Sequence, residues 1–185
     1  PADFVAGIPH AVTVKSQSKD RTDYILHPPS GEILNATSVA KIERLRDSHA
    51  GNYDVQIVIS DGLNAFALTD EGHFSPYLES VHALLAEDGY HASPEHIVAR
   101  AGRVRVGYRI GELLYGELPD DSSYRTILHV IGERPGSGHH AFSVYITATH
   151  VSTWTKKGRA DHNITKVVSG IADTALTPAQ AAADT

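Results

Sequence analysis

Two kinds of hydrophobic pattern alternate along the 185 residues of this chain. Residues 55–60 and 126–131 are rich in aliphatic side chains at nearly every position, which predicts strands buried on both faces of a parallel sheet. Residues 32–48 and 75–89 place apolar side chains every three or four positions, as amphipathic helices do. Strands that alternate with helices in this way predict an open, doubly wound α/β sheet.

Shorter patterns extend this sheet within one expected domain over residues 1–185. Further strands are predicted at residues 11–15, 24–27, 96–100 and 142–149. Short helices are predicted at residues 110–114, where Gly116 ends the pattern, and after Thr177, which has capping-box spacing to Gln180.

The composition is that of a globular protein, and it excludes several kinds of chemistry. Hydrophobic residues make up 41% and charged residues 21% of the chain, so a folded core is expected. The 16 Lys and Arg against 22 Asp and Glu give a net charge of −6, which argues against a dedicated nucleic-acid-binding protein. The absence of cysteine excludes disulfides, thiolate metal sites and cysteine nucleophiles. The sequence has no signal-peptide pattern or long apolar run, and we expect a soluble protein.

Polar residues and glycines directly follow the two strands with the strongest burial pattern. Residues 60–64 read Ser-Asp-Gly-Leu-Asn after the first strand, and residues 132–136 read Gly-Glu-Arg-Pro-Gly after the second. Ligands of open α/β sheets bind where the strands end, at the carboxyl edge. The sequence therefore predicts a ligand-binding α/β domain, in which the turn of Asp61 and Gly62 either caps the next helix or binds a polar ligand.

Three other kinds of site are disfavoured by their context. Residues 136–141 fit the G-x-G-x-x-G/A pattern of dinucleotide sites, but the strand-like residues 142–147 follow where such a site needs a helix N-terminus. None of the 12 histidines has the H-E-x-x-H spacing of zinc enzymes, and no compact carboxylate cluster completes a metal site. A hydrolase that uses Asp61 and a histidine stays open as a weaker alternative, since the G-x-S-x-G motif is absent.

Three segments, in this order along the chain, resemble one known family. Residues 55–63 read Val-Gln-Ile-Val-Ile-Ser-Asp-Gly-Leu, and residues 130–136 read Val-Ile-Gly-Glu-Arg-Pro-Gly. Between them, Gly-Arg-Val at 102–104 is followed by Ile-Gly-Glu-Leu-Leu at 110–114. These blocks are similar to the small (light) subunit of ethanolamine ammonia-lyase, an adenosylcobalamin-dependent enzyme. Each block is short, and it is their order that makes the resemblance specific.

The resemblance implies a fold, a cofactor and a partner. The fold would be Rossmann-like, an open and mostly parallel sheet with helices on both faces. The domain would dock on a large barrel subunit and enclose adenosylcobalamin at the interface of a hetero-oligomer. The large subunit would deaminate ethanolamine to acetaldehyde and ammonia, so this chain alone would have no activity. A cytoplasmic location is implied, with a bacterial microcompartment left open.

The resemblance also assigns cofactor-binding residues. By matching position, contacts with the corrin ring fall on Val104 and Glu133. Arg134, Asp61 and Gly62 belong to the same expected site and complete the predicted cofactor-binding set. The rim of a cobalamin carries amide groups, and a carboxylate such as that of Glu133 can accept hydrogen bonds from them. No catalytic residue and no metal ligand is assigned to this chain.

One part of the family pattern is missing. The family has a cysteine at the cofactor near its C-terminus, and the corresponding residues 162–167 read His-Asn-Ile-Thr-Lys-Val, without a thiol. A free-standing corrinoid-binding or scaffolding module, without lyase activity, is the alternative function that the sequence leaves open.

Overall fold

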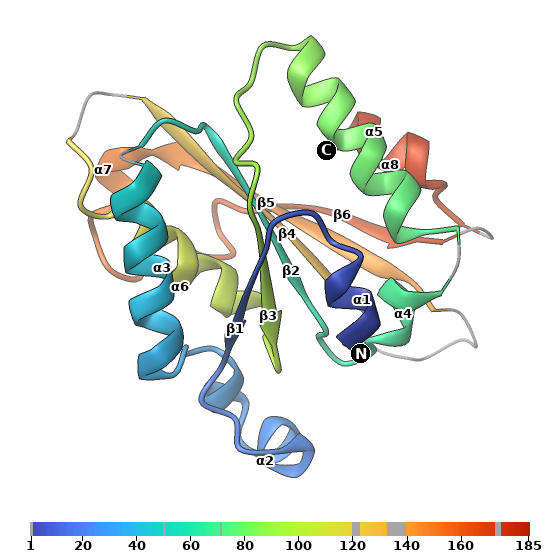
Figure 1. Ribbon diagram of the computed structural model, residues 1–185, viewed down its shortest axis with the longest axis horizontal. Helices are drawn as coiled ribbons and strands as arrows, with labels where there is room; N and C mark the ends of the chain where they lie inside the picture. Colours follow the sequence, from blue (N-terminus) through green and yellow to red (C-terminus); the bar gives the residue numbers. More distant parts are fainter. Residues whose placement is uncertain (1, 50, 71, 120–122, 133–139, 173–174) are drawn as a thin grey trace.

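The computed structural model describes residues 2–49, 51–70, 72–119, 123–132, 140–172 and 175–185 (Figure 1). Within these residues six strands form one sheet, in the order β1-β3-β2-β4-β5-β6. The strands are β1 (Ala11–Lys15), β2 (Val55–Ser60), β3 (His96–Arg100), β4 (Tyr124–Gly132), β5 (Phe142–His150) and β6 (Lys166–Ile171). The helices are α1 (Ala2–Ala6), α2 (Arg21–Leu26), α3 (Ala36–His49), α4 (Phe66–Thr69), α5 (Phe74–Glu87), α6 (Val104–Tyr115), α7 (Val151–Trp154) and α8 (Pro178–Asp184), with a 3-10 turn η1 (Pro28–Gly31).

The sheet is mixed. Strands β1, β3, β2 and β4 pair in parallel, as expected, whereas the pairs β4–β5 and β5–β6 are antiparallel. Only residues 133–141 connect β4 to β5. A parallel crossover needs a dozen or more residues, so this short connection returns the chain antiparallel to β4. The expected α/β class with a mostly parallel sheet is confirmed, and β5 and β6 extend that sheet with an antiparallel part that was not predicted.

Helices cover both faces of the sheet, as predicted (Figure 1). Helices α1, α4, α5 and α8 pack on one face, around a core that includes Ile57 and Ile59. Helices α3, α6 and α7 pack on the other face, around a core that includes Val58. Every residue of β2 is buried, because successive side chains of this central strand enter opposite cores.

Two helices begin at positions that the hydrophobic pattern did not indicate. Residues 24–27 were predicted as a strand, and this is wrong, because they lie in and just after α2. Helix α2 begins after Asp20, whose carboxylate accepts a hydrogen bond from the backbone N–H of Asp23 and caps the helix. Helix α3 begins at Ala36 rather than at residue 32, since the Asn35 side chain accepts from the N–H of Ser38 at 2.9 Å.

The chain reverses its direction across the sheet beside β2. From β2 it runs through α5, on one face, to β3, and then through α6, on the other face, to β4. The loops after β2 and β3 therefore leave the same edge of the sheet toward opposite faces, and the loop after β4 leaves that edge beside them. This is the topological switch point at which open α/β sheets bind ligands. No helix of the described residues is long and apolar enough to cross a membrane.

Candidate functional site

The loops that follow β2 and β4 pack directly against each other at the switch point. The N–H of Leu63 donates to the carbonyl oxygen of Gly132 at 3.2 Å. Gly62 has a φ of +55°, and a Cβ at this position would overlap the carbonyl oxygen of Gly132. A Cβ at Gly132 would in turn overlap the carbonyl oxygen of Asn64. Only glycine fits at either position, because the two backbones approach so closely.

A small hollow opens beside these glycines, and we call it the switch-point pocket. Its volume is about 190 Å³. Its lining residues come from α2, the η1 turn region, both strand ends, α6, β5 and the segment before β6: Tyr24, Glu32, Gly62, Leu63, Arg103, Val104, Arg105, Ile131, Gly132, Tyr145 and His162. Segments far apart in the sequence therefore meet at this edge of the sheet.

The wall beside α2 is held by arginine side chains. The guanidinium of Arg103 lies 4.5 Å from the centre of the Tyr24 ring, and its Nη2 donates to the carbonyl oxygen of Tyr24 at 2.6 Å. From α2, Arg21 Nη2 donates to the carbonyl oxygen of Leu63 at 2.8 Å. The Nε atom of Arg103 is buried and has no hydrogen-bond partner among the described residues. An unpaired N–H donor is therefore present in a residue of the pocket wall.

A buried hydrogen-bonded chain fixes the start of α6 beside the pocket. Ser60 Oγ lies 2.6 Å from His129 Nε2, and His129 Nδ1 lies 3.2 Å from the carbonyl oxygen of Val104. Burial lowers the pKa of His129 from 6.5 to about 4, and the bond to Val104 acts in the opposite direction. The imidazole is therefore neutral at neutral pH. Its Nδ1–H donates a hydrogen bond to the carbonyl oxygen of Val104, and its Nε2 accepts a hydrogen bond from the Ser60 hydroxyl.

This serine–histidine pair does not form a hydrolytic site. Ser60 is 1% and His129 2% exposed, and the serine hydroxyl and the imidazole are already hydrogen-bonded within the protein, to each other and to the carbonyl oxygen of Val104. A Cβ at Gly107 would lie 2.6 Å from His129 Nδ1, so the imidazole also depends on a glycine one turn into α6. Ser60, His129 and Gly107 position the first turn of α6, which carries Val104.

Asp61 ties together the loops after β2 and β3. Its carboxylate oxygens accept hydrogen bonds from the backbone N–H groups of Ala101, at 3.0 Å, and Gly102, at 3.1 Å. Burial raises the pKa of this carboxyl, and the two bonds act in the opposite direction. The carboxylate of Asp61 is thus engaged by the protein itself, which argues against the hydrolase alternative that used it.

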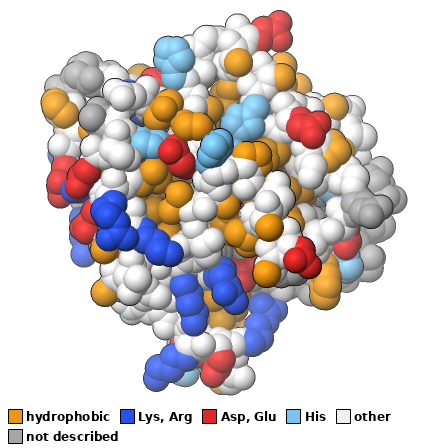
Figure 2. Space-filling view, in the orientation of Figure 1, with side chains coloured by type: hydrophobic (Ala, Val, Ile, Leu, Met, Phe, Trp, Pro, Cys, Tyr) orange, Lys and Arg blue, Asp and Glu red, His pale blue; other side chains and the backbone are white. Residues whose placement is uncertain are grey.

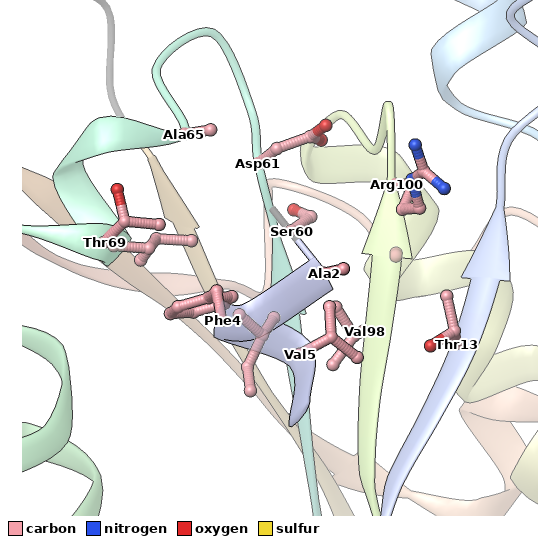
Figure 3. A pocket seen from close by; sticks show the side chains of 13 residues that line it. Ala2, Phe4, Val5, Thr13, Ser60, Asp61, Ala65, Thr69, Val98 and Arg100 are labelled. Carbon is pink, nitrogen blue, oxygen red and sulfur yellow. The ribbon is translucent and has the colours of Figure 1, made fainter. Parts of the chain in front are cut away.

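A larger hollow lies on the other face of the sheet, at the same edge (Figure 3). Its volume is about 490 Å³, and α1, α4 and the ends of β2 and β3 line it. Asp61 and Arg100 lie toward one end of this hollow, and Phe4 and Val5 of α1 lie toward the other (Figure 3). Asp61 thus borders this larger hollow, whereas its neighbour Gly62 lines the switch-point pocket.

The comparison with known proteins decides the family. The model of the family described as "Ethanolamine ammonia-lyase light chain (EutC)" matches residues 3–185. The chain belongs to this family. The family that the three sequence blocks resembled is therefore confirmed.

Relatives of the light-chain family have the same name in several bacteria. The protein of Xanthomonas campestris pv. campestris (strain ATCC 33913), named ethanolamine ammonia-lyase small subunit, is 32% identical over 138 residues, which are 74% of this chain and 47% of the relative. The protein of the same name from Pseudomonas putida (strain GB-1) gives the same identity and shares. That of Pseudomonas syringae pv. tomato is 31% identical over 137 residues, 74% of this chain and 44% of the relative. This chain thus spans about half the length of the curated relatives it matches.

The structure brings together part of the predicted light-chain site. Gly62 and Val104 both line the switch-point pocket, and Asp61 lies beside it as a structural link. Glu133 and Arg134 directly follow Gly132, which lines the pocket, but both lie outside the described residues. Residues 136–139 of the glycine motif lie outside them as well.

Sequence reasoning did not single out several side chains of the pocket. Arg103 stands within one of the family blocks, and its position before Val104 was the available signal. His162 stands in the segment that matches the family's cysteine segment, which was also a signal. Tyr145 comes from β5 and carried no signal, because its place at the pocket depends on the pairing of β5 with β4. In the described residues, no group of three or more His, Asp or Glu side chains could hold a metal ion.

Proposed function

We propose that this chain is the small subunit of an ethanolamine ammonia-lyase-type enzyme and binds adenosylcobalamin at the switch-point pocket, against a large barrel subunit. The observation that carries the proposal is the place of Val104. The family resemblance assigns this residue to the corrin ring, and it lines a pocket at the switch point of the sheet, next to Gly132 and hence to the start of the Glu133 segment. We also propose that the fold is a variant of the Rossmann-like fold. The enzyme would act in the cytoplasm.

The chemistry of the pocket fits the rim of a corrinoid. The acetamide and propionamide groups of that rim carry both N–H donors and carbonyl acceptors. The pocket offers the Glu32 carboxylate as an acceptor and the guanidinium groups of Arg103 and Arg105 as donors.

The size of the pocket supports a shared site. A volume of about 190 Å³ holds one edge of a corrinoid and not the whole molecule. The remainder of the cofactor would therefore need a second surface, as a binding site between two subunits provides.

The surroundings of the pocket suit contact with another protein. Several large apolar side chains that stand within three positions along the sequence of a pocket-lining residue are exposed to solvent. Leu26 is 67% and Phe66 65% exposed. Ile25, Ile33 and Ile164 are further exposed side chains of this kind. On the face shown in Figure 2, Lys and Arg side chains gather toward the lower part, where α2 and the carboxyl edge lie in Figure 1. A chain of net charge −6 thus has a locally basic edge, which suits a partner surface of acidic character.

The role of this chain in the reaction would be binding and orientation. When bound, adenosylcobalamin supplies the radical chemistry that the protein groups cannot. Arg103, Glu32 and the first turn of α6 would hold the rim of the corrinoid, and the buried chain from Ser60 to Val104 would fix that turn. The large subunit would hold ethanolamine, whose conversion to acetaldehyde and ammonia is an atom-balanced elimination.

A titration with adenosylcobalamin tests the proposal. The chain, the large subunit and their complex are each titrated, and binding is followed by absorbance, with ammonia release from ethanolamine measured in parallel. We expect tight binding and ammonia release from the complex only. Ammonia release by the chain alone, or a complex that binds no cobalamin, contradicts the proposal. Cobalamin binding by the chain alone without any complex formation favours a free-standing corrinoid-binding module.

A matched pair of variants locates the site. Val104→Phe adds bulk to the pocket, and we expect it to weaken cobalamin binding to the complex by about 10-fold or more, the cost of a steric misfit of roughly 1.4 kcal/mol or more. Ala83→Phe introduces the same aromatic side chain at an exposed position of α5, on the opposite face of the sheet from α6, and serves as the control. Equal binding by both variants would place the cofactor elsewhere.

A further inference from the structure

His162 reaches the switch-point pocket from a segment far from the other lining residues in the sequence. It lies between α7 and β6 and lines the pocket together with Val104 and Tyr145. Its ring is 5.4 Å from that of Tyr108, in an edge-to-face arrangement. Its Nδ1 lies 3.0 Å from the Tyr108 hydroxyl. Tyr108 follows Val104 by four residues on α6, so the two share one face of the helix.

The contact with Tyr108 engages Nδ1 of His162 and leaves Nε2 as the ring nitrogen that can face a ligand. Burial raises the pKa of Tyr108, so its hydroxyl keeps its proton and can donate it. With the Tyr108 O–H donating to Nδ1, a neutral His162 carries its own proton on Nε2. The two ring nitrogens point in different directions, so Nε2–H faces away from Tyr108. Among the described residues, Nε2 has no hydrogen-bond partner.

We propose that His162, oriented by Tyr108, is a further cofactor-binding side chain, whose Nε2–H donates a hydrogen bond to an acceptor oxygen of the corrinoid. This inference rests on the proposed function and adds a residue to its site. The acceptor chemistry has two sources in the corrinoid: the carbonyl of a side-chain amide of the ring, or the phosphate of the nucleotide loop. Tyr108 is a positioning residue, since it would act on the ligand only through His162.

The test uses the complex with the large subunit and measures the dissociation constant of adenosylcobalamin by absorbance. His162→Ala is expected to weaken binding by about 3- to 10-fold, the change that loss of one neutral hydrogen bond produces. His162→Gln retains an N–H donor of similar reach and is expected to recover most of the affinity. His91→Ala removes an exposed histidine outside the pocket and is the matched control. Tyr108→Phe keeps the buried ring, frees His162 and is expected to give an intermediate loss.

Two further measurements make the outcomes distinct. The melting temperature of each isolated variant distinguishes the loss of a ligand contact from a loss of stability. We expect His162→Ala to have the same melting temperature as the wild type. Adenosylcobinamide lacks the nucleotide loop: a loss that persists with it assigns the acceptor to a ring amide, and a loss that disappears assigns it to the phosphate.

Affinity equal to wild type in His162→Ala, or a loss in His162→Gln as large as in His162→Ala, would overturn the inference while leaving the proposed function intact. A wild-type complex that binds no cobalamin would overturn both.

Discussion

His129 should make the stability of this chain dependent on pH in a measurable way. Its pKa is about 4 in the folded chain, against 6.5 for an ordinary histidine. The folded state therefore favours the neutral imidazole, and the stability that this residue contributes is fully present above pH 6.5. It is lost as the pH falls from 6.5 toward about 4, because the unfolded chain binds the proton first. The difference between the two pKa values corresponds to about 3 kcal/mol over this range.

His129→Gln removes the titrating group and retains a polar side chain beside Ser60. The variant should be less stable at neutral pH, since the bonds to Ser60 and Val104 are altered. Its free energy of unfolding should, however, fall by about 3 kcal/mol less than that of the wild type between neutral pH and about pH 4. His82 and His96 also have pKa values lowered chiefly by burial, but they are present in both proteins and cancel in the comparison.

The assay is urea unfolding at a series of pH values, followed by circular dichroism. Ser60→Ala is the control, because it removes one hydrogen bond and leaves the buried imidazole. Its free energy of unfolding should be lower at every pH, with the same dependence on pH as the wild type. Parallel curves for wild type and His129→Gln would refute the reasoning, since they would mean that His129 titrates as it does in the unfolded chain.

Three further changes test the loops at the switch point. Gly62→Ala should lower the free energy of unfolding by about 2 kcal/mol or more, measured by urea unfolding, because the new Cβ meets the Gly132 carbonyl at a positive φ; an unchanged value would contradict the close approach of the two loops. Asp61→Ala should cost about 2–4 kcal/mol in the same assay, because the N–H groups of Ala101 and Gly102 lose their acceptor; a loss of cobalamin affinity without a loss of stability would instead make Asp61 a ligand contact. Glu133→Ala should weaken cobalamin binding to the complex by roughly 10- to 150-fold, the loss of one charge-assisted hydrogen bond, with little change in melting temperature; unchanged affinity in a less stable chain would move Glu133 from the site to the scaffold.

The sequence predicted those parts of the fold that leave a pattern in neighbouring residues, such as a run of aliphatic side chains or a helix cap. Strand β2 is buried on both faces and is therefore aliphatic almost throughout. The terminal helix α8 begins at Thr177, whose side chain accepts from the N–H of Gln180, as the capping-box spacing indicated. Strand β6 has only Ile171 buried, so its residues show no alternation and were not recognised. Helix α2 has six residues and one buried side chain, which is too little for a helical period.

The candidate site likewise has a part that the local sequence predicted and a part that it did not. That glycines and polar residues gather after β2 and β4 follows from their local sequence, and so did the prediction for Gly62. The pairing of Ser60 with His129 joins residues 69 positions apart, and that of Tyr108 with His162 joins residues 54 apart. Such pairs depend on which strands are neighbours and on which face each helix lies. His129 was therefore counted only as part of a buried strand, and the link that Asp61 makes between the loops after β2 and β3 was not predicted.

Hydrogen exchange measured by mass spectrometry on the complex with the large subunit, with and without adenosylcobalamin, tests the cofactor site most directly. The account predicts that the cofactor slows exchange in peptides that contain residues 60–64 and 103–108. Peptides with residues 51–54 and 91–95, which precede β2 and β3 at the opposite edge of the sheet, should be unaffected. Slower exchange at the opposite edge, with no change at residues 60–64 and 103–108, would contradict the binding of cobalamin at the switch point.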